Sequence, residues 1–362
     1  MGKCKSCGDR SPLITEALEV CCKCIRENFS GVEEIVREKH SKSRRYFSLL
    51  EKPPVNENGV ACKVCVNDCR IPLNGTGFCG IRKNVGGKIS PQKDGFLDWY
   101  YDSLPTNCVA SWVCAGCSTS GYPEYSYSKK PEYGYKNLAV FFRACSFDCL
   151  FCQNWHFRTG PGNNISPGDL AARVDSRTSC ICYFGGDPGP QVIFAIRASK
   201  LAIPRNKIVR ICWETNGSVN KKFLKRMAEL SMKTGGCIKF DLKTYNEYLN
   251  LALCGVTNAR TLENFSYLAS LFDRRKDPPF LIASTLLIPG YIDVEEVRSI
   301  ARFIADLNPE IPYSLLGFYP TFEINDLPTT SKSHAYKAYE AAKAEGLRNV
   351  HIGNRHLLSS RD

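Results

Sequence analysis

The sequence contains no uninterrupted apolar run of the roughly 20 residues that a membrane-spanning helix requires. Its first ten residues are polar and include cysteines, whereas a secretory signal has an apolar stretch. Internal repeats, coiled-coil heptads and low-complexity tracts are also absent. These absences argue against a membrane protein, a secreted protein and a repeat architecture. We therefore expect a globular, cytoplasmic protein.

The composition is that of a folded enzyme with a basic surface. The chain has 362 residues, 43% of them hydrophobic, and a formal net charge of +12. Such a length permits one large catalytic domain and a smaller one. A positive charge suits an acidic protein partner, an anionic cofactor or nucleic acid. The densest basic run, residues 37–45, is interpreted as a solvated helix end, so nucleic acid is not favoured as a partner.

Cysteine is abundant, with 20 residues in the chain. In a reducing compartment such thiols indicate metal ligands rather than disulfides. Twelve of them precede residue 120, three form a group near residue 150, and five are scattered singly. We interpret the scattered ones, in or beside apolar runs, as small core residues; they are Cys180, Cys182, Cys212, Cys237 and Cys254.

The second part of the chain alternates short apolar runs with segments of helical periodicity, which predicts an α/β fold with a parallel sheet. An open sheet, a complete barrel and a partial barrel all fit this pattern. We predict three regions: a zinc-ribbon-like region (1–50), a second cysteine-rich metal-binding region (51–134) and the α/β domain (135–362). The apolar runs are 138–142, 180–184, 208–213, 238–242, 280–288, 314–319 and 349–352.

The most informative motif follows the first of these runs. Cys145, Cys149 and Cys152 are spaced so that three thiolates can hold one corner of a four-iron four-sulfur cluster and leave its fourth iron open. The alternative is structural zinc, which requires four ligands. No fourth cysteine lies close in sequence, so the motif favours the cluster.

This triplet, with Phe151 just before its last cysteine, resembles the signature of the radical S-adenosylmethionine (SAM) superfamily. The resemblance implies a partial (β/α)6 TIM-type barrel at residues 135–362. It also implies that SAM binds the open iron and is cleaved to a 5′-deoxyadenosyl radical, with the electron coming from an external donor.

Later motifs resemble the same superfamily, and more narrowly the activating enzymes of glycyl-radical proteins. The resemblance implies that Gly185 and Gly186 let the backbone approach the methionine amine, and that Asp187 replaces a usual glutamate. It likewise implies cofactor contacts for Phe151 and for residues at the ends of the next two apolar runs, which are Asn216, Asp241 and Lys243.

The front of the chain predicts further metal sites. Two Cys-x-x-Cys pairs, Cys4 with Cys7 and Cys21 with Cys24, are separated by 13 residues and are typical of a four-thiolate zinc or iron site. A second metal centre is predicted at Cys62, Cys65, Cys69 and Cys79. A third group of cysteines either adds ligands to this centre or replaces some of its four. That group is Cys108, Cys114 and Cys117.

The combined pattern resembles an archaeal branch related to pyruvate formate-lyase activase. It implies modification of a protein or peptide substrate, and the leading specific hypothesis is cobalamin-dependent C-methylation of a residue such as a glutamine of methyl-coenzyme M reductase. No cobalamin-binding signature is present in the sequence, so cobalamin rests on the resemblance alone. The alternatives are a glycyl-radical activase and a metal-stapled RNA- or protein-binding module with a degenerate barrel.

Overall fold

The computed structural model describes residues 1–360 and has at its centre a mixed sheet of nine strands. Seven strands are parallel and each contains or overlaps one of the predicted apolar runs, which confirms the predicted α/β fold. Their order follows the chain from one edge of the sheet to the other. The strands are β8 (Lys136–Phe142), β10 (Thr178–Gly185), β11 (Arg210–Thr215), β12 (Ile238–Asp241), β13 (Leu281–Leu287), β14 (Tyr313–Gly317) and β15 (Val350–Gly353).

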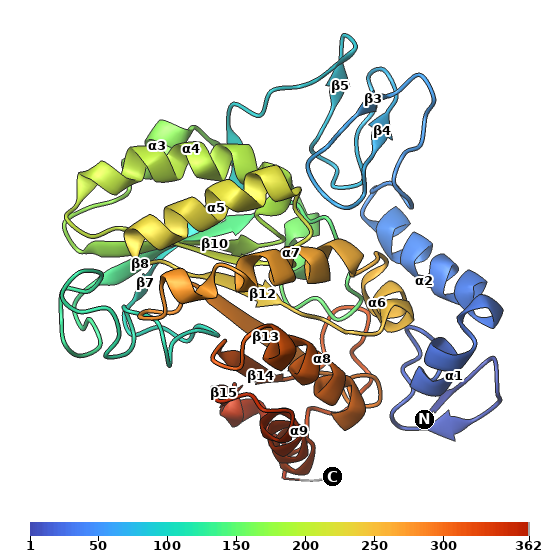
Figure 1. Ribbon diagram of the computed structural model, residues 1–362. Helices are drawn as coiled ribbons and strands as arrows, with labels where there is room; N and C mark the ends of the chain where they lie inside the picture. The colour runs from blue at the N-terminus through green and yellow to red at the C-terminus, as the bar shows by residue number, and fades with distance from the viewer. Residues whose placement is uncertain (361–362) are drawn as a thin grey trace.

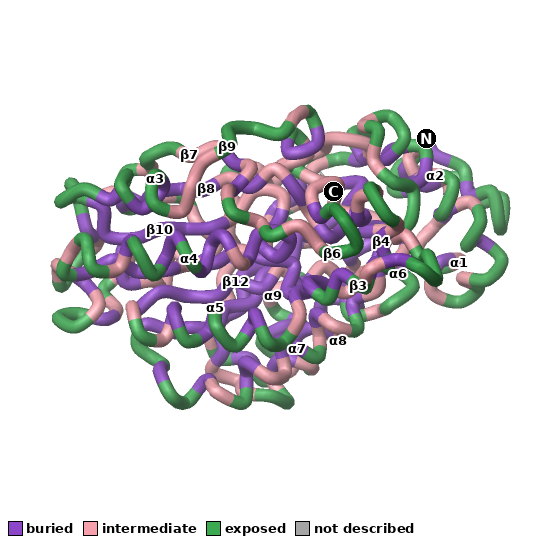
Figure 2. The backbone as a smooth tube through the Cα atoms, turned by 90° about the horizontal axis from the view of Figure 1, so that it is seen from above, coloured by how far each residue is buried: buried purple, intermediate pink, exposed green. Residues whose placement is uncertain are grey.

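Helices connect the seven parallel strands, so six strand–helix repeats are followed by a last strand. They flank the sheet in Figure 1, and the strands form the buried interior in Figure 2. In α8 the apolar positions 297, 300, 301 and 304 are buried, as the helical period requires. The helices are α3 (Pro167–Ala171), α4 (Val192–Ala202), α5 (Lys221–Thr234), α6 (Glu247–Cys254), α7 (Ala259–Ala269), α8 (Val294–Leu307) and α9 (Lys332–Ala344).

Two further strands, joined by antiparallel pairings, extend the sheet beyond β8. Strand β7 (Gly95–Ser103) pairs with β8, and β9 (Asn163–Ile165) pairs with β7. Within the described residues β15 and β9 are the two edges, so the barrel is partial. Strand β7 lies inside the region 51–134 that we predicted as cysteine-rich and metal-binding. Its exposed, aspartate-containing second half lacks the apolar run of a buried strand.

The direction of β7 determines where the chain goes next. Leu97 lies opposite Phe142 and Ser103 opposite Lys136, so β7 ends at the amino ends of the parallel strands. Residues 104–135, which we call the plug segment, therefore begin and end there. The Trp112 indole N–H donates to the Ser314 hydroxyl over 3.0 Å. The plug segment thus reaches from β7 across the barrel to β14.

The N-terminal region packs against the other end of the barrel, as its blue trace in Figure 1 shows. Its apolar residues belong to the same hydrophobic core as the barrel strands. The Tyr291 hydroxyl anchors it by donating to the Val20 carbonyl over 2.9 Å. Its elements are β1 (Gly2–Lys3), β2 (Arg10–Ser11), α1 (Cys22–Glu27), α2 (Glu33–Tyr46), β3 (Val60–Ala61), β4 (Arg70–Ile71), β5 (Asn84–Val85) and β6 (Lys88–Ile89).

Short 3₁₀ turns complete the described structure, at Phe29–Gly31, Trp155–Arg158, Gly189–Gln191, Ile203–Arg205, Phe272–Arg274 and Arg355–Leu357. No helix among residues 1–360 combines the length and the apolar character needed to cross a membrane.

Candidate functional site

The predicted cluster cysteines lie in the loop after β8, at the carboxyl ends of the parallel strands. This is the end at which barrels of this type carry their active sites. The loop borders a cavity of about 670 Å³ inside the barrel. All ten residues predicted to bind the cluster or SAM line this one cavity: Cys145, Cys149, Phe151, Cys152, Gly185, Gly186, Asp187, Asn216, Asp241 and Lys243.

Backbone hydrogen bonds hold the cysteine loop in place. The Asp148 N–H donates to the Cys254 carbonyl over 2.8 Å, and the Leu150 N–H donates to the Leu253 carbonyl over 3.0 Å. The end of α6 therefore supports the loop from behind. Cys254 itself is fully buried and does not line the cavity.

The sulfur of Cys145 receives two N–H contacts. The Phe147 N–H lies 3.4 Å from it, and the Asn216 amide lies 3.8 Å from it. Such donors favour a thiolate, which is the form that binds iron. The triad therefore fits the cluster that the sequence predicts, because three buried or half-buried thiols face one cavity and at least one carries donors suited to a ligated sulfur.

A buried carboxylate within the motif, Asp148, was not predicted from the sequence to be a site residue. It accepts hydrogen bonds from His40 (2.8 Å), Arg44 (3.2 Å) and Arg158 (2.7 Å). Burial acts to raise the pKa of Asp148, but the His40 hydrogen bond and the two arginine charges outweigh it and lower that pKa. Asp148 is therefore ionised, and it links helix α2 to the cysteine loop.

Residues 185 and 186 must be glycine because the backbone at the end of β8 lies too close to them for any side chain. A Cβ on Gly185 would lie 2.6 Å from the Phe142 nitrogen, and one on Gly186 would lie 2.2 Å from the Ala144 carbonyl oxygen. Gly185 also has a φ of +106°. Any side chain at either position would push the β10 loop away from the cysteine loop.

Asp187, predicted to meet the cofactor, is already bonded within the protein. Its carboxylate accepts from the Gly189 N–H (2.7 Å), the Thr215 hydroxyl (2.8 Å) and the Asn216 N–H (2.9 Å). Burial raises its pKa to about 6, although these three donors oppose the rise. In this structure Asp187 joins the loops after β10 and β11.

The other predicted cofactor residues converge on the same side of the cavity. Lys243 forms an ion pair with Asp241, and its ammonium lies 5.4 Å from the centre of the Phe151 ring. Burial acts to lower the pKa of Lys243, but the negative charges of Asp241 and Cys149 have the larger effect and raise that pKa, so this lysine is a cation. The Asn216 amide donates to Ser146 over 2.9 Å. Arg158, which the sequence did not predict as a site residue, also lines the cavity, and its buried Nε and Nη2 atoms have no hydrogen-bond partner among residues 1–360.

The four cysteines of the first predicted metal site form a compact group. The ligand atoms of Cys4, Cys7, Cys21 and Cys24 all lie within 4.8 Å of one another, and the Cys7 and Cys21 sulfurs are 3.8 Å apart. Zinc–sulfur bonds of about 2.3 Å in a tetrahedron separate the sulfurs by about 3.8 Å. The group can hold one tetrahedral metal ion.

The second cysteine block, Cys62 to Cys79, is packed beside the cysteine loop. The Asn67 amide donates to the Ser146 carbonyl over 2.7 Å, and the Val66 N–H donates to the Ser218 carbonyl over 3.0 Å. The block therefore touches the loops after β8 and β11. Metal binding by Cys62, Cys65, Cys69 and Cys79 stays a prediction.

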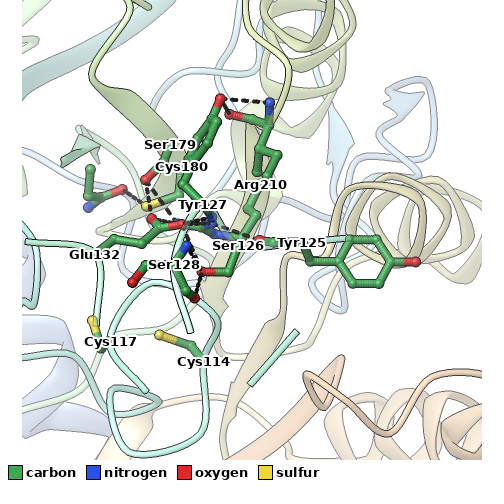
Figure 3. A network of polar contacts seen from close by, with 12 residues as sticks. Cys114, Cys117, Tyr125, Ser126, Tyr127, Ser128, Glu132, Ser179, Cys180 and Arg210 are labelled. Carbon is green, nitrogen blue, oxygen red and sulfur yellow. Dashed lines mark hydrogen bonds and ion pairs between the residues drawn. The ribbon is translucent and has the colours of Figure 1, made fainter. Parts of the chain in front are cut away.

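The third cysteine group lies elsewhere. Cys108, Cys114 and Cys117 belong to the plug segment, line the barrel cavity and share it with four of the scattered cysteines, which are Cys180, Cys182, Cys212 and Cys237. These four are largely buried, as expected, but their place on the cavity wall was not foreseen. Figure 3 shows Cys114 and Cys117 beside an ion pair that links the plug segment to β11.

Comparison with known proteins agrees with this geometry. Residues 139–304 match the family model described as the Radical SAM superfamily. An uncharacterised protein of Methanocaldococcus jannaschii is 24% identical over 83% of this chain and 83% of its own. The pyruvate formate-lyase 1-activating enzyme of Escherichia coli is 28% identical, over 49% of this chain and 74% of its own.

A further relative is the isethionate sulfite-lyase activating enzyme of Desulfovibrio desulfuricans, which is 34% identical over 37% of this chain. The chain spans only 40% of that enzyme's length. The similarity is therefore confined to part of that enzyme.

Proposed function

Because residues 139–304 form a radical SAM domain, we propose that this chain cleaves SAM reductively and directs the resulting radical to a carbon atom of a polypeptide substrate. The observation that supports this is the convergence of the cysteine triad and all seven predicted cofactor residues on one cavity. When bound, the cluster and SAM supply the electron transfer and the 5′-deoxyadenosyl radical. An external donor supplies the electron.

In this proposal the chain's own residues position the reactants. Cys145, Cys149 and Cys152 hold the cluster through three thiolates, which leaves one iron for the cofactor. Lys243 is a half-buried cation at the cavity wall and suits the cofactor carboxylate. Arg158 is a second cation that lines this cavity; its Nη1 is paired with Asp148, and two of its nitrogens have no hydrogen-bond partner within the part of the chain that the structure describes.

Asp187 has a supporting role in this proposal. Its carboxylate ties the Gly189 and Asn216 backbone to one point, so it fixes the two loops that border the triad. Replacing it with Asn would remove the charge that three donors share. We expect the cofactor to bind less tightly in that variant because the loops are less well fixed.

The substrate class rests on the relatives and on charge. Two of the relatives are named as activating enzymes of lyases, so their targets are proteins. The net charge of +12 favours an acidic or neutral partner surface, an attraction that salt weakens. Both considerations support a polypeptide.

The test is anaerobic turnover with reductant, SAM and peptides from candidate partners. We expect 5′-deoxyadenosine to form, and to form faster with the substrate peptide. A wild-type protein that carries a full cluster yet cleaves no SAM with any peptide would disprove the proposal and would favour the binding-module alternative.

The same reaction separates the two candidate modifications. C-methylation of a residue such as a glutamine of methyl-coenzyme M reductase would add about 14 mass units to the peptide and require added cobalamin. Activase chemistry would give a glycyl radical, detectable by electron paramagnetic resonance, with no gain in mass. The activating-enzyme relatives favour the second outcome.

A further inference from the structure

The amino end of the barrel contains a group of cysteines that the proposed function does not use. The plug segment brings Cys108 and Cys114 against Ala110, where they pack with Cys212 and Cys237 of the barrel. Trp112 secures this arrangement by its bond to Ser314 and by stacking on His351, with the ring centroids 5.1 Å apart. The plug cysteines are therefore fixed to the strands.

The barrel itself presents a row of thiols toward the plug segment. Cys182 of β10 is paired in register with Cys212 of β11. Glu214 of β11 is paired with Lys239 of β12. Two residues earlier on both strands, Cys237 therefore lies beside Cys212 and continues the row. Neighbouring strands are about 4.8 Å apart, and side chains two residues apart share a face. All three thiols line the cavity.

Lys239 lies between the row and the plug segment. Its ammonium donates to the Cys108 sulfur over 3.1 Å and to the Cys182 sulfur over 3.0 Å, whereas the nearest carboxylate, Glu214, is 3.6 Å away. The lysine is 1% exposed. A buried charge requires compensation, and here two sulfurs are its shortest contacts. This arrangement favours negative charge on the sulfurs.

The neighbouring cation is compensated in another way. The Arg210 guanidinium donates to both oxygens of Glu132, over 2.9 and 2.6 Å, and to the Ser179 hydroxyl (Figure 3). Glu132 belongs to the plug segment, so this pair fastens the segment to β11. Arg210 is therefore compensated by a carboxylate at 2.6–2.9 Å, whereas the carboxylate nearest to Lys239 is 3.6 Å away and two sulfurs lie closer.

We propose that this group binds a second iron–sulfur cluster, with four ligands drawn from six cysteines: Cys108, Cys114, Cys117, Cys182, Cys212 and Cys237. A single zinc ion would bring its ligand sulfurs about 3.8 Å apart. Within residues 1–360, no three of these six have sulfurs that all lie within 4.8 Å of one another. Among the described residues, the triad Cys145, Cys149 and Cys152 likewise forms no such compact group, and it is the predicted site of the first cluster.

The test begins with the full-length variant in which Cys145, Cys149 and Cys152 are all replaced by Ser, reconstituted anaerobically with iron and sulfide. We expect it to keep about one cluster's worth of iron and acid-labile sulfide, with a signal in electron paramagnetic resonance after reduction. Adding Cys108→Ser, Cys114→Ser and Cys117→Ser should remove that cluster. The matched control replaces Cys62, Cys65, Cys69 and Cys79 by Ser in the same background and should retain it.

Three outcomes would overturn the proposal: no iron and sulfide in the triad variant, zinc alone in their place, or a cluster lost only in the control. If the plug variant does not fold, Lys239→Gln in the triad background gives an independent answer. Loss of the adjacent cation should make the remaining cluster's reduction potential more negative. An unchanged potential would show that the cluster is not at this site. Because the readouts are metal content and spectra in a protein that cannot cleave SAM, the result is independent of the proposed function.

Discussion

Each end of the barrel has a buried ion network, but the two networks draw their residues from different parts of the chain. At the carboxyl end, Asp148 of the cysteine loop takes its partners from helix α2 and from Arg158. At the amino end, Glu132 of the plug segment and Arg210 of β11 form a single bidentate pair. Because two of the partners of Asp148 belong to α2, the carboxyl end of the barrel is bonded to the N-terminal region. The loop that carries the triad therefore depends on the N-terminal region, whereas the plug end does not.

The largest expected effect is at the triad. Replacing Cys145, Cys149 or Cys152 with Ser should reduce SAM cleavage to the level of a reaction without enzyme, because three thiolates are needed to hold the cluster. Cleavage is measured as 5′-deoxyadenosine by chromatography. The metal at Cys4, Cys7, Cys21 and Cys24 should remain, and a variant with full cleavage activity would show that the cluster is held elsewhere.

The comparison of the two ends predicts different consequences for matched substitutions. Asp148→Asn and Glu132→Gln each leave buried cations without a carboxylate, which typically costs about 3–5 kcal/mol in the free energy of unfolding. Anaerobic denaturant titration measures both. Only Asp148→Asn should also lower the iron content of the triad, because only that network supports the cysteine loop.

Equal loss of triad iron in the two variants would contradict the difference between the ends. Ser128→Ala, in the plug segment but outside the ion pair, is the control for nonspecific effects of substitution there.

The N-terminal metal group should affect stability without affecting chemistry. Cys7→Ser together with Cys21→Ser should remove one metal equivalent and lower the unfolding temperature, since metal binding to such a segment supplies folding free energy. Cleavage per cluster should change less than about twofold. A metal content equal to that of wild type, by inductively coupled plasma mass spectrometry, would disprove the site.

The smallest expected effect is a pH dependence of the plug end. Burial acts to raise the pKa of Glu132, but the Arg210 hydrogen bond and charge outweigh it and lower that pKa below the unfolded value of about 4.3. The unfolded state then binds the proton first as pH falls, so the pair's contribution is complete above about pH 4.3 and is lost as pH falls through the lowered pKa. The stability difference between wild type and Glu132→Gln should be constant from pH 6 to 8 and shrink below about pH 4.

Much of the fold could be predicted because the parallel strands are buried on both faces and so read as apolar runs. Strand β7 could not, since it is half exposed and carries Asp98 and Asp102. The triad is local in sequence and was found, whereas the Asp148 network joins residues 108 positions apart. The cysteines of the strand row look like core residues in sequence, and only the register of β10 to β12 shows that they face the plug segment.

The bond between His40 and Asp148 also bears on where the functional unit begins. A fragment cut at the limits of the family match, residues 139–304, would keep the triad and lose both partners that α2 contributes. The Asp148 carboxylate would then be left with Arg158 alone, on a surface newly open to water. We therefore expect a fragment limited to the matched residues to hold the cysteine loop poorly, and a minimal version of this protein should retain helix α2.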